Sequence, residues 1–508
     1  MAQNRASDAA LLTPREMGEA DRRTISAGTP GIVLMERAAT AIAAAAIERF
    51  PAALRIALLA GPGNNGGDAY AAAAILLRAG RDVRLFHLGP PGKLSGDAAI
   101  AAAAYHGPAG ALSEFRAEAF DLVVDGLFGA GLSRPLEGEV AEVVTRLKAA
   151  ATPVLAVDLP SGISGETGAV LGAAVAAEAT VTFFRKKPGH LVEPGRSHCG
   201  AVIVADIGIS DAVLSEIGPR TFETGPALWH ERLVLPSEAG HKYDRGHAVV
   251  FSGGASQTGA ARLSATAALR AGAGLVTVFS PASALLVNAA HLTAVMLKRC
   301  EDAAELEERL GDGRLNAFVL GPGFGQAENA RAYAQAVLAA GRRLVLDADG
   351  ITAFQDDPAT LFDAAGEAGK ARADGEPALV LTPHAGEFKR LFPDLAAADD
   401  LSKPVRARQA AARSNAVVVL KGRDTVIAAP DGRAAINASG TPWLATAGTG
   451  DVLTGIVAAQ LAQGTPSFEA AAAGVWMHGK AAEAFGPGLI AEDLPTMLPR
   501  VFALLAGG

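Results

Sequence analysis

The segment TPWLATAGTGDVLTGIVAAQLAQG, residues 441–464, places a single acid, Asp451, between glycines and an apolar stretch. Gly448 and Gly450 allow backbone N–H groups to approach an anion closely, and the residues that follow predict a helix over 452–461 with its positive end toward that anion. An aspartate beside a phosphate can take a proton from an attacking hydroxyl. The alternative is that Asp451 only caps the helix.

Acidic side chains also follow apolar runs in the first half of the chain. LLAGPGNNGGDAYAAAAILLRAG, residues 58–80, predicts a strand, a glycine-rich loop and a helix, and two later runs end at Asp125 and Asp158. The paired asparagines of the loop carry amide oxygens, which are hard ligands suited to an alkali cation or a ribose. With Asn65 and Ser161 nearby, the two carboxylates could share a cation and leave one acid free as a base. The alternative for each aspartate is a turn or a loop cap.

Short apolar runs, each followed by a glycine-bearing turn and a helical stretch, recur in both halves of the chain. Examples are RIALLAG, DLVVDGLFG, PVLAVDLPSG, HAVVFSGG, RLVLDADG and AVVVLKG. Strands that are apolar on both faces and alternate with helices predict parallel sheets in three-layer α/β/α domains. In such domains, ligands bind outside the carboxyl ends of the strands. We therefore expect the acidic and glycine-rich loops to form the functional sites.

The stretch over roughly 207–240 is rich in proline, glycine and charge and predicts a connection between domains. Placing the boundary near 225 gives domains of 1–225 and 226–508. The chain has 508 residues, of which half are hydrophobic and 19% are charged, so each domain can bury a sizeable core.

Composition narrows the classes of partner. A net charge of −8 gives no electrostatic footprint for nucleic acid or an anionic membrane, so small-molecule partners are favoured. The two cysteines, Cys199 and Cys300, predict neither a disulfide framework nor a thiolate metal site. Without a signal segment or an apolar stretch of about 18 to 20 residues, we expect a soluble cytoplasmic protein.

The second half carries a string of specific motifs: HKYDRGHAVVFSGGASQTGAARLSATAALRAGAGLVTV, LTPHAGEF, LKGRDTVIAAPDGR and GTPWLATAGTGDVLTG. In this order they resemble the ADP/ATP-dependent NAD(P)H-hydrate dehydratases, a branch of the ribokinase-like superfamily, over nearly the whole chain after residue 225. That family repairs nicotinamide cofactors in which water has added to the dihydropyridine ring and left a hydroxyl on C6.

The resemblance implies a kinase-like mechanism that uses ADP and Mg2+. Asp451 would be the base on the C6 hydroxyl as it attacks the terminal phosphate. The implied nucleotide-binding residues are Lys421, Gly422, Arg423, Asp424, Thr425 and Gly450. Those implied to contact the hydrate are Ala260, Gly323, His384 and Asp451.

Three of these residues have simpler interpretations. His384 could be a turn residue that makes one backbone hydrogen bond. Gly323 could merely permit a turn between a strand and a helix. Lys421 could be a solvated surface charge.

The first half is similar to the YjeF N-terminal family, the NAD(P)H-hydrate epimerases, from about residue 12 to 208. The match includes LTPREMGEADRRTISAGTPGIVLMERAATAIA and KKPGHLVEPG besides the segments that carry Asn65, Asp125 and Asp158. The resemblance implies a Rossmann-like domain that interconverts R- and S-hydrates, with Asp158 as the acid/base residue at C6. It implies K+ ligands Asn65, Asp125 and Ser161. The implied substrate contacts are Asn64, Asn65, Gly66, Gly67, Asp68, Gly129, Ala130, Gly131, Leu132, Ser133, Arg134, Pro135 and Asp158.

Both resemblances point to successive steps on one damaged cofactor and so predict a bifunctional repair enzyme, expected to be a homo-oligomer, with NADHX and NADPHX as substrates. One alternative is a ribokinase-like kinase of a thiazole or pyrimidine alcohol, against which the HKYDRG and TPHAGEF segments weigh. Another is a nucleotide-binding or apolipoprotein-binding adaptor, against which the intact Asp158, Asn65 and Asp451 weigh. The residues do not distinguish ADP from ATP or NADHX from NADPHX.

Overall fold

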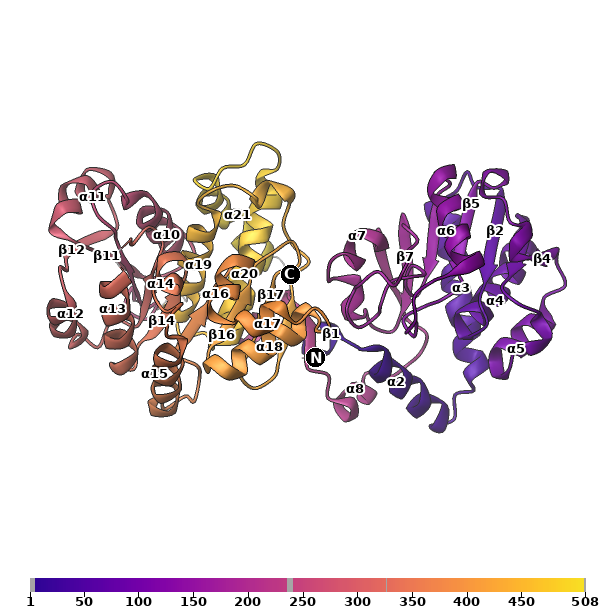
Figure 1. Cartoon of the computed structure of the whole chain (residues 1–508), viewed down its shortest axis with the longest axis horizontal. Coiled ribbons are helices and arrows are strands. Elements are labelled where there is room, and N and C mark those ends of the chain that lie inside the picture. The colour runs from indigo at the N-terminus through magenta and orange to yellow at the C-terminus, as the bar shows by residue number, and fades with distance from the viewer. Residues whose placement is uncertain (1–4, 235–240, 326, 507–508) are drawn as a thin grey trace. The chain divides into compact units, whose positions relative to one another are not determined.

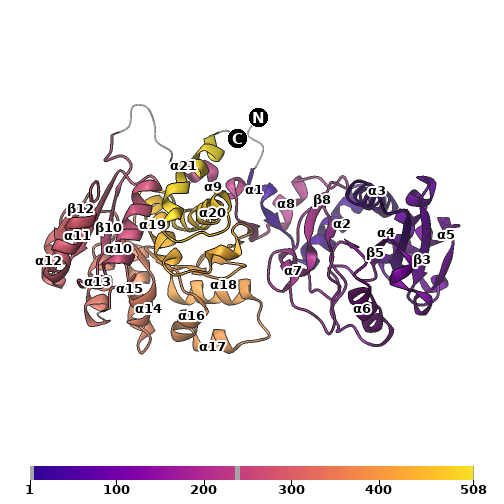
Figure 2. The same cartoon turned by 90° about the horizontal axis from the view of Figure 1, so that it is seen from above.

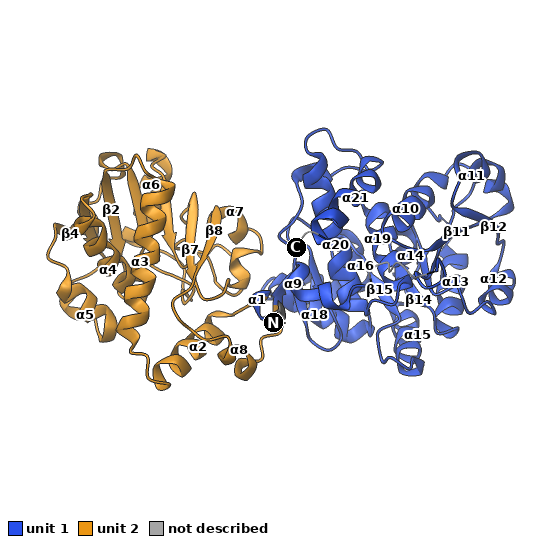
Figure 3. Cartoon of the chain, turned by 180° about the vertical axis from the view of Figure 1, so that it is seen from behind, with its two compact units in different colours: residues 1–9, 222–508 blue, residues 10–221 orange. Residues whose placement is uncertain are grey.

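The computed structural model describes residues 5–234, 241–325 and 327–506. Contacts divide the chain into two compact units, which we call the N-terminal unit, residues 10–221, and the C-terminal unit, residues 1–9 with 222–508 (Figure 3). The boundary lies inside the stretch predicted as a connection, of which 235–240 are outside the described residues. The first residues join the C-terminal unit because helix α1 (Arg5–Asp8) packs against α9 (Pro226–Trp229).

The N-terminal unit is built on a parallel sheet with strand order β4-β3-β2-β5-β6-β7-β8. Its central strands are buried on both faces, which explains their continuous apolar sequences. The strands are β2 (Arg55–Ala60), β3 (Asp82–His87), β4 (Ala109–Ala111), β5 (Leu122–Gly126), β6 (Val154–Val157), β7 (Ala179–Phe183) and β8 (Ala201–Ala205). The short β1 (Ala10–Leu11) precedes them in the chain and is not part of this sheet.

Helices cover both faces of this sheet. Figures 1 and 2 show α3 and α4 on one side and α6 on the other, and the two sides form separate apolar clusters. The alanine-rich runs 39–46 and 98–104 lie within α3 and α5 and pack in the core of the unit. The helices are α2 (Pro14–Ser26), α3 (Gly31–Arg49), α4 (Asn64–Arg78), α5 (Gly96–Ala104), α6 (Gly138–Ala150), α7 (Gly195–Cys199) and α8 (Ala212–Ile217).

The C-terminal unit has a larger sheet with strand order β9-β18-β17-β16-β15-β14-β13-β10-β11-β12. The strands from β16 to β12 pair in parallel, while β17 and β18 add an antiparallel edge. They are β9 (Thr221–Glu223), β10 (His247–Phe251), β11 (Leu275–Ser280), β12 (Met296–Arg299), β13 (Ala317–Leu320), β14 (Arg343–Leu346), β15 (Leu379–Leu381), β16 (Val417–Leu420), β17 (Val426–Ala428) and β18 (Ala434–Ile436).

Helices again form two outer layers. On one face α10, α19, α20 and α21 share a core with the strands, and Figure 2 shows α13, α15 and α18 on the opposite face. The remaining bounds are α10 (Thr258–Arg270), α11 (Leu285–His291), α12 (Ala303–Leu310), α13 (Ala327–Ala339), α14 (Ala348–Thr352), α15 (Pro358–Ala371), α16 (Ala385–Leu391), α17 (Pro393–Ala397), α18 (Lys403–Ser414), α19 (Thr449–Ala462), α20 (Ser467–Phe485) and α21 (Asp493–Ala506).

The predicted fold class is confirmed, because each unit is a three-layer α/β/α arrangement around a mainly parallel sheet. Among the described residues, no helix has both the length and the apolar character needed to cross a membrane.

Candidate active sites

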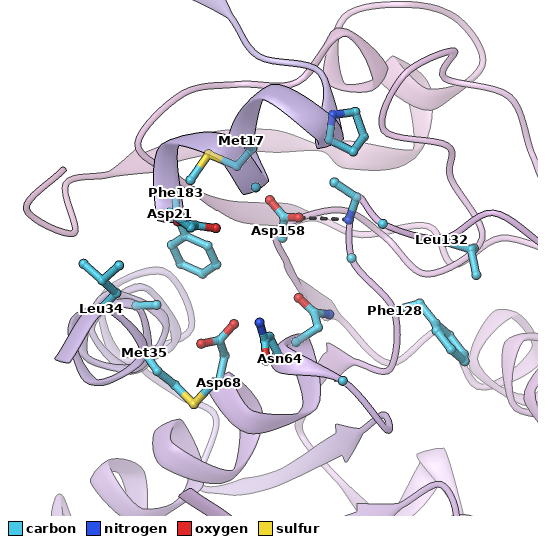
Figure 4. A pocket seen from close by; sticks show the side chains of 18 of the residues that line it. Met17, Asp21, Leu34, Met35, Asn64, Asp68, Phe128, Leu132, Asp158 and Phe183 are labelled. Atoms are coloured by element: carbon cyan, nitrogen blue, oxygen red, sulfur yellow. Dashed lines mark hydrogen bonds between the residues drawn. The ribbon is translucent and has the colours of Figure 1, made fainter. Parts of the chain in front are cut away.

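A cavity of about 620 Å³ opens at the carboxyl ends of β2, β5 and β6 in the N-terminal unit (Figure 4). Helices α2 and α3 supply its other walls. Most of the predicted substrate contacts line it: Asn64, Asn65, Asp68, Gly129, Ala130, Gly131, Leu132, Ser133, Arg134 and Asp158. Gly66, Gly67 and Pro135 are not among the lining residues.

The predicted glycine-rich loop is largely helical, since α4 begins at Asn64 and Gly63 precedes it as the N-cap. The glycines allow close packing within that first part of the helix. A Cβ on Gly66 would lie 1.9 Å from the carbonyl oxygen of Gly61, and one on Gly67 would lie 2.8 Å from the sulfur of Met35. The start of α4 therefore presents its free backbone N–H groups at the cavity, where an anion can bind.

Asp158 directly follows β6 in a left-handed conformation, with φ of +63°, which is strained for a non-glycine residue. Its Oδ1 accepts hydrogen bonds from Lys187 Nζ at 2.7 Å and Thr182 Oγ1 at 3.0 Å, and its Oδ2 accepts from Ala130 N at 2.9 Å. Burial opposes ionisation, but the charge and hydrogen bond of Lys187 outweigh it and hold the pKa of Asp158 at about 2. The carboxylate is anionic at neutral pH.

Lys187 was not predicted, although the KKPG segment that contains it was noted. Its side chain is 1% exposed, and its backbone N–H donates to His190 Nδ1 at 2.9 Å. Burial, followed by the charge of Lys187, lowers the pKa of His190 to about 4, so the ring is neutral and its Nε2 donates to the carbonyl oxygen of Asp158 at 2.7 Å. Both residues thus fix the position of Asp158.

Two more carboxyl groups point into the cavity, Asp21 from α2 and Asp68 from α4 (Figure 4). Burial raises the pKa of Asp21 to about 6, and burial raises that of Asp68 well above its usual range. The nearby charge of Asp158 adds to both shifts. Asp21 was not predicted; it lies in the GEADRR segment quoted for the family resemblance.

The predicted cation ligands meet beside this cavity. Asp125 is fully buried, and Ser161 donates to it from N at 2.8 Å and from Oγ at 2.7 Å. Asn65 Oδ1 lies 2.8 Å from a Cβ placed on Gly129, and its Nδ2 is buried without a hydrogen-bond partner. In the described part of the chain, no basic side chain pairs with Asp125. A buried carboxylate among hydroxyl and amide oxygens fits a hard monovalent cation.

In the C-terminal unit, Asp451 lies in the first turn of α19, three residues after the N-cap Gly448, whose φ is +86°. The prediction that the helix starts at 452 was wrong, and the alternative that Asp451 is the cap is excluded, because Gly448 holds that position. Burial, aided by the charge of Asp347 and opposed by Lys421, raises the pKa of Asp451 to about 6.

Lys421 lies close to the start of the same helix. Its Nζ is 2.8 and 3.1 Å from the two carboxylate oxygens of Asp347 and 3.9 Å from Glu387 Oε2. A Cβ on Gly450 would lie 3.5 Å from this Nζ. Lys421 is therefore part of an ion-pair cluster rather than a solvated surface charge. Asp347 and Glu387 were not assigned, although LDADG and TPHAGEF carry them.

The rest of the KGRDT segment forms a tight turn. Thr425 Oγ1 donates to the carbonyl oxygen of Gly422 at 2.7 Å and accepts from its N–H at 3.1 Å. Asp424 pairs with Lys403, whereas Arg423 is exposed. The turn begins beside the TPH segment because Lys421 N donates to the carbonyl oxygen of Pro383 at 2.9 Å.

The other predicted contacts lie in two places. His384 is the N-cap of α16, where its Nδ1 accepts from Gly386 N at 2.9 Å, so the simpler interpretation describes its local role; its side chain is 57% exposed. Gly323 has φ of +60°, and a Cβ there would lie 3.2 Å from the Cβ of Ala260. Ala260 and Gly323 therefore adjoin.

Two family models match the chain. Residues 31–189 match the YjeF-related protein N-terminus, and residues 248–500 match NAD(P)H-hydrate dehydratase. The two matches fall in different compact units.

Full-length relatives match both units at once. A bifunctional NAD(P)H-hydrate repair enzyme Nnr of Gloeobacter violaceus is 37% identical and covers 93% of each chain. The enzyme of the same name from Mycobacterium tuberculosis is 38% identical to this chain and covers 82% of this chain and 80% of its own length. A Bacillus subtilis ADP/ATP-dependent NAD(P)H-hydrate dehydratase, co-crystallised with ATP/Mg2+, is 28% identical, with a TM-score of 0.45, and covers 54% of this chain and 96% of its own.

Proposed function

The chain belongs to the family of bifunctional NAD(P)H-hydrate repair enzymes, and from this premise we propose how its two units divide the work. The N-terminal unit interconverts the R- and S-hydrates of NADH and NADPH. The C-terminal unit dehydrates the S-hydrate with ADP as phosphoryl donor and releases AMP and phosphate. The observation that supports the division best is that the two family matches fall in different compact units, each of which has its own candidate carboxylate, Asp158 or Asp451.

In the C-terminal unit, Asp451 takes the proton of the C6 hydroxyl as its oxygen attacks the terminal phosphorus of ADP. A carboxyl group with a pKa of about 6 is a more effective proton acceptor than an ordinary aspartate. The bond from phosphorus to AMP breaks. Phosphate then leaves C6 with help from the ring nitrogen, and loss of a proton from C5 restores the double bond.

The neighbouring residues bind the nucleotide. Backbone N–H groups at the start of α19, near Gly450, face the phosphates, and Lys421 can move from Asp347 to the transferred phosphoryl group. Lys421 to Thr425 hold the rest of the nucleotide, while Ala260, Gly323 and His384 contact the hydrate. Mg2+, when bound, neutralises charge on the phosphates.

In the N-terminal unit, Asp158 accepts the proton of the C6 hydroxyl, and the residues from 64 to 68 and from 129 to 135 hold the substrate. Asn65, Asp125 and Ser161 would hold K+, which would supply positive charge near the substrate. We further propose a cytoplasmic location and a homo-oligomer.

The experiment mixes the protein with both epimers of hydrated NADH, ADP and Mg2+, and follows the absorbance of NADH. We expect full recovery with the wild type and none with Asp451→Asn. Asp158→Asn should repair the S-hydrate and leave the R-hydrate to its spontaneous epimerisation. Stable phosphorylation of a thiazole or pyrimidine alcohol would instead support a kinase, and loss of both activities in Asp158→Asn would contradict separate sites.

A further inference from the structure

Four aspartates from different elements line the cavity of the N-terminal unit: Asp21 on α2, Asp68 on α4, Asp97 on α5 and Asp158 after β6. Figure 4 shows Asp21, Asp68 and Asp158 directed toward the same space. Two basic residues line the same cavity. Lys187 is buried and bound to Asp158, whereas Arg134 is exposed. The buried part of the cavity thus holds more acidic groups than its ammonium group can neutralise.

Asp21 and Asp68 have no hydrogen bond or ion pair within the described residues. Asp68 is only 9% exposed, yet its carboxyl points unpartnered into the cavity (Figure 4). Carboxylates that share a poorly solvated site cannot all ionise, because burial and mutual repulsion both favour the protonated form. At least one of these carboxyl groups therefore carries a proton while Asp158 stays anionic.

We propose that Asp21 is a further catalytic residue of the epimerisation, the proton donor that works with the anionic Asp158; this rests on the proposed function of the N-terminal unit. A pair of carboxyl groups whose environments push their pKa values apart supplies an acid and a base in one site. Asp158, fixed by Lys187, is the base. Asp21 points into the same space from α2 and supplies the acid.

C6 of the hydrate carries both the hydroxyl and the ring nitrogen N1, so its stereochemistry can change by reversible ring opening. Asp158 removes the hydroxyl proton, the C6–N1 bond breaks with its electron pair on N1, and Asp21 gives N1 a proton, leaving an aldehyde at C6. Rotation about C5–C6 presents the opposite face. N1 then adds back to C6 and returns its proton to Asp21, while Asp158 returns a proton to the oxygen.

Asp21 suits this role better than Asp68. A proton donor that must be recharged in each cycle works best when its pKa lies near the working pH. The pKa of Asp21 is about 6, whereas burial raises the pKa of Asp68 well above its usual range and thus disfavours its charged form. The charged groups that act on Asp21 are Lys187, Asp158 and Asp68, with Arg22 on its own helix, and Asp97 of α5 lines the same cavity. Glu216 of α8, which packs on α2, pairs with Arg23.

The test measures interconversion of purified R- and S-hydrates without ADP, so that the C-terminal site is idle, and subtracts the spontaneous rate. Asp21→Asn should lower kcat about 100-fold or more, a decrease typical of the loss of a general acid. Glu19→Gln is the matched control, since it removes a carboxylate from the same helix but from a surface pair with Arg22 and Arg23. Dehydration of the S-hydrate with ADP should be unchanged in both variants.

The pH profile separates a proton donor from a residue that only positions the substrate. In the wild type, kcat/KM for epimerisation should fall as pH rises above about 6, because Asp21 loses its proton. Asp21→Asn should lack this decline, and Asp21→Glu should restore part of both the rate and the decline. Hydrogen exchange of α2 and α4 in Asp21→Asn should match the wild type, so that misfolding is recognised.

The outcomes are distinguishable. A wild type that does not accelerate interconversion would disprove the proposed function itself. If the wild type does accelerate it, an Asp21→Asn rate within about threefold of Glu19→Gln would overturn the inference. So would a slowed Asp21→Asn that keeps the decline above pH 6.

Discussion

Replacing Asp451 by asparagine should make the C-terminal unit more stable at neutral pH while it abolishes dehydration. The pKa of this carboxyl is raised from 3.8 to about 6, so the folded protein binds the proton more tightly than the unfolded chain does. Ionisation therefore costs free energy only in the folded state. This cost is absent below pH 4, grows between pH 4 and 6, and is constant above that range.

The magnitude follows from the shift. About two pKa units at ~1.4 kcal/mol each give a cost of up to about 3 kcal/mol at pH 7.5, falling to about 1 kcal/mol at pH 4.5. Asparagine removes this cost but also loses the attraction between a carboxylate and the start of α19, about 0.3–1 kcal/mol. We therefore expect a net gain of about 2 kcal/mol at pH 7.5 and about 1 kcal/mol at pH 4.5, because at pH 4.5 the folded carboxyl is already protonated and has no such attraction to lose.

The assay is urea unfolding followed by tryptophan fluorescence. All three tryptophans, Trp229, Trp443 and Trp476, belong to the C-terminal unit, so the signal reports on that unit alone. Glu492→Gln, which removes an exposed carboxylate near α21, is the control and should change the free energy of unfolding by less than about 0.5 kcal/mol. A loss of stability at pH 7.5, or the same gain at both pH values, would refute the reasoning.

Three further predictions concern the site of the N-terminal unit. Lys187→Met leaves Asp158 buried without its partner, so it should destabilise the N-terminal unit by about 3–5 kcal/mol, measured by hydrogen exchange of β7. Adding Asp158→Asn should recover part of that loss, and equal protection in Lys187→Met and the wild type would contradict the prediction. Gly66→Ala should abolish epimerisation and leave dehydration unchanged, because the Cβ of the alanine would collide with the carbonyl oxygen of Gly61. An unchanged epimerisation rate would show that epimerisation does not need the close packing of Gly66 against Gly61. Replacing K+ by choline should slow epimerisation but not dehydration. Asp125→Asn, which alters the buried carboxylate at the proposed cation site, should be insensitive to this replacement. An epimerisation rate of the wild type that does not depend on K+ would disprove the role of the cation.

Much of the fold could be predicted because its strands are buried on both faces. Runs such as residues 154–157 and 417–420 have no polar face, and their alternation with helices leaves few arrangements other than a parallel sheet between two helical layers. The sites were then expected at the carboxyl ends of these strands, where the cavity, Asp125 and Asp158 lie.

Helix starts were harder to predict. Glycine disfavours helix, so the segments around Gly66 and Gly450 were interpreted as loops. Both glycines lie inside the first turn of a helix. At Gly66 the reason is local packing, because only a residue without a side chain fits against the carbonyl oxygen of Gly61, five positions earlier.

The partners that set the pKa values could not be predicted from spacing. Lys187 lies 29 positions after Asp158, and Asp347 lies 74 positions before Lys421, so nothing local links either pair. Asp21 reaches the cavity only because α2 closes over the ends of the strands. Such contacts depend on how the layers pack.

The most direct test of the repair mechanism follows the oxygen atom on C6. S-hydrate prepared with ¹⁸O in its C6 hydroxyl is incubated with the wild type, ADP and Mg2+, and the released phosphate is analysed by mass spectrometry. Our account predicts one ¹⁸O atom in each phosphate for each NADH recovered, because the hydroxyl oxygen leaves as part of that phosphate. Recovery of NADH with the label in water and unlabelled phosphate would contradict it.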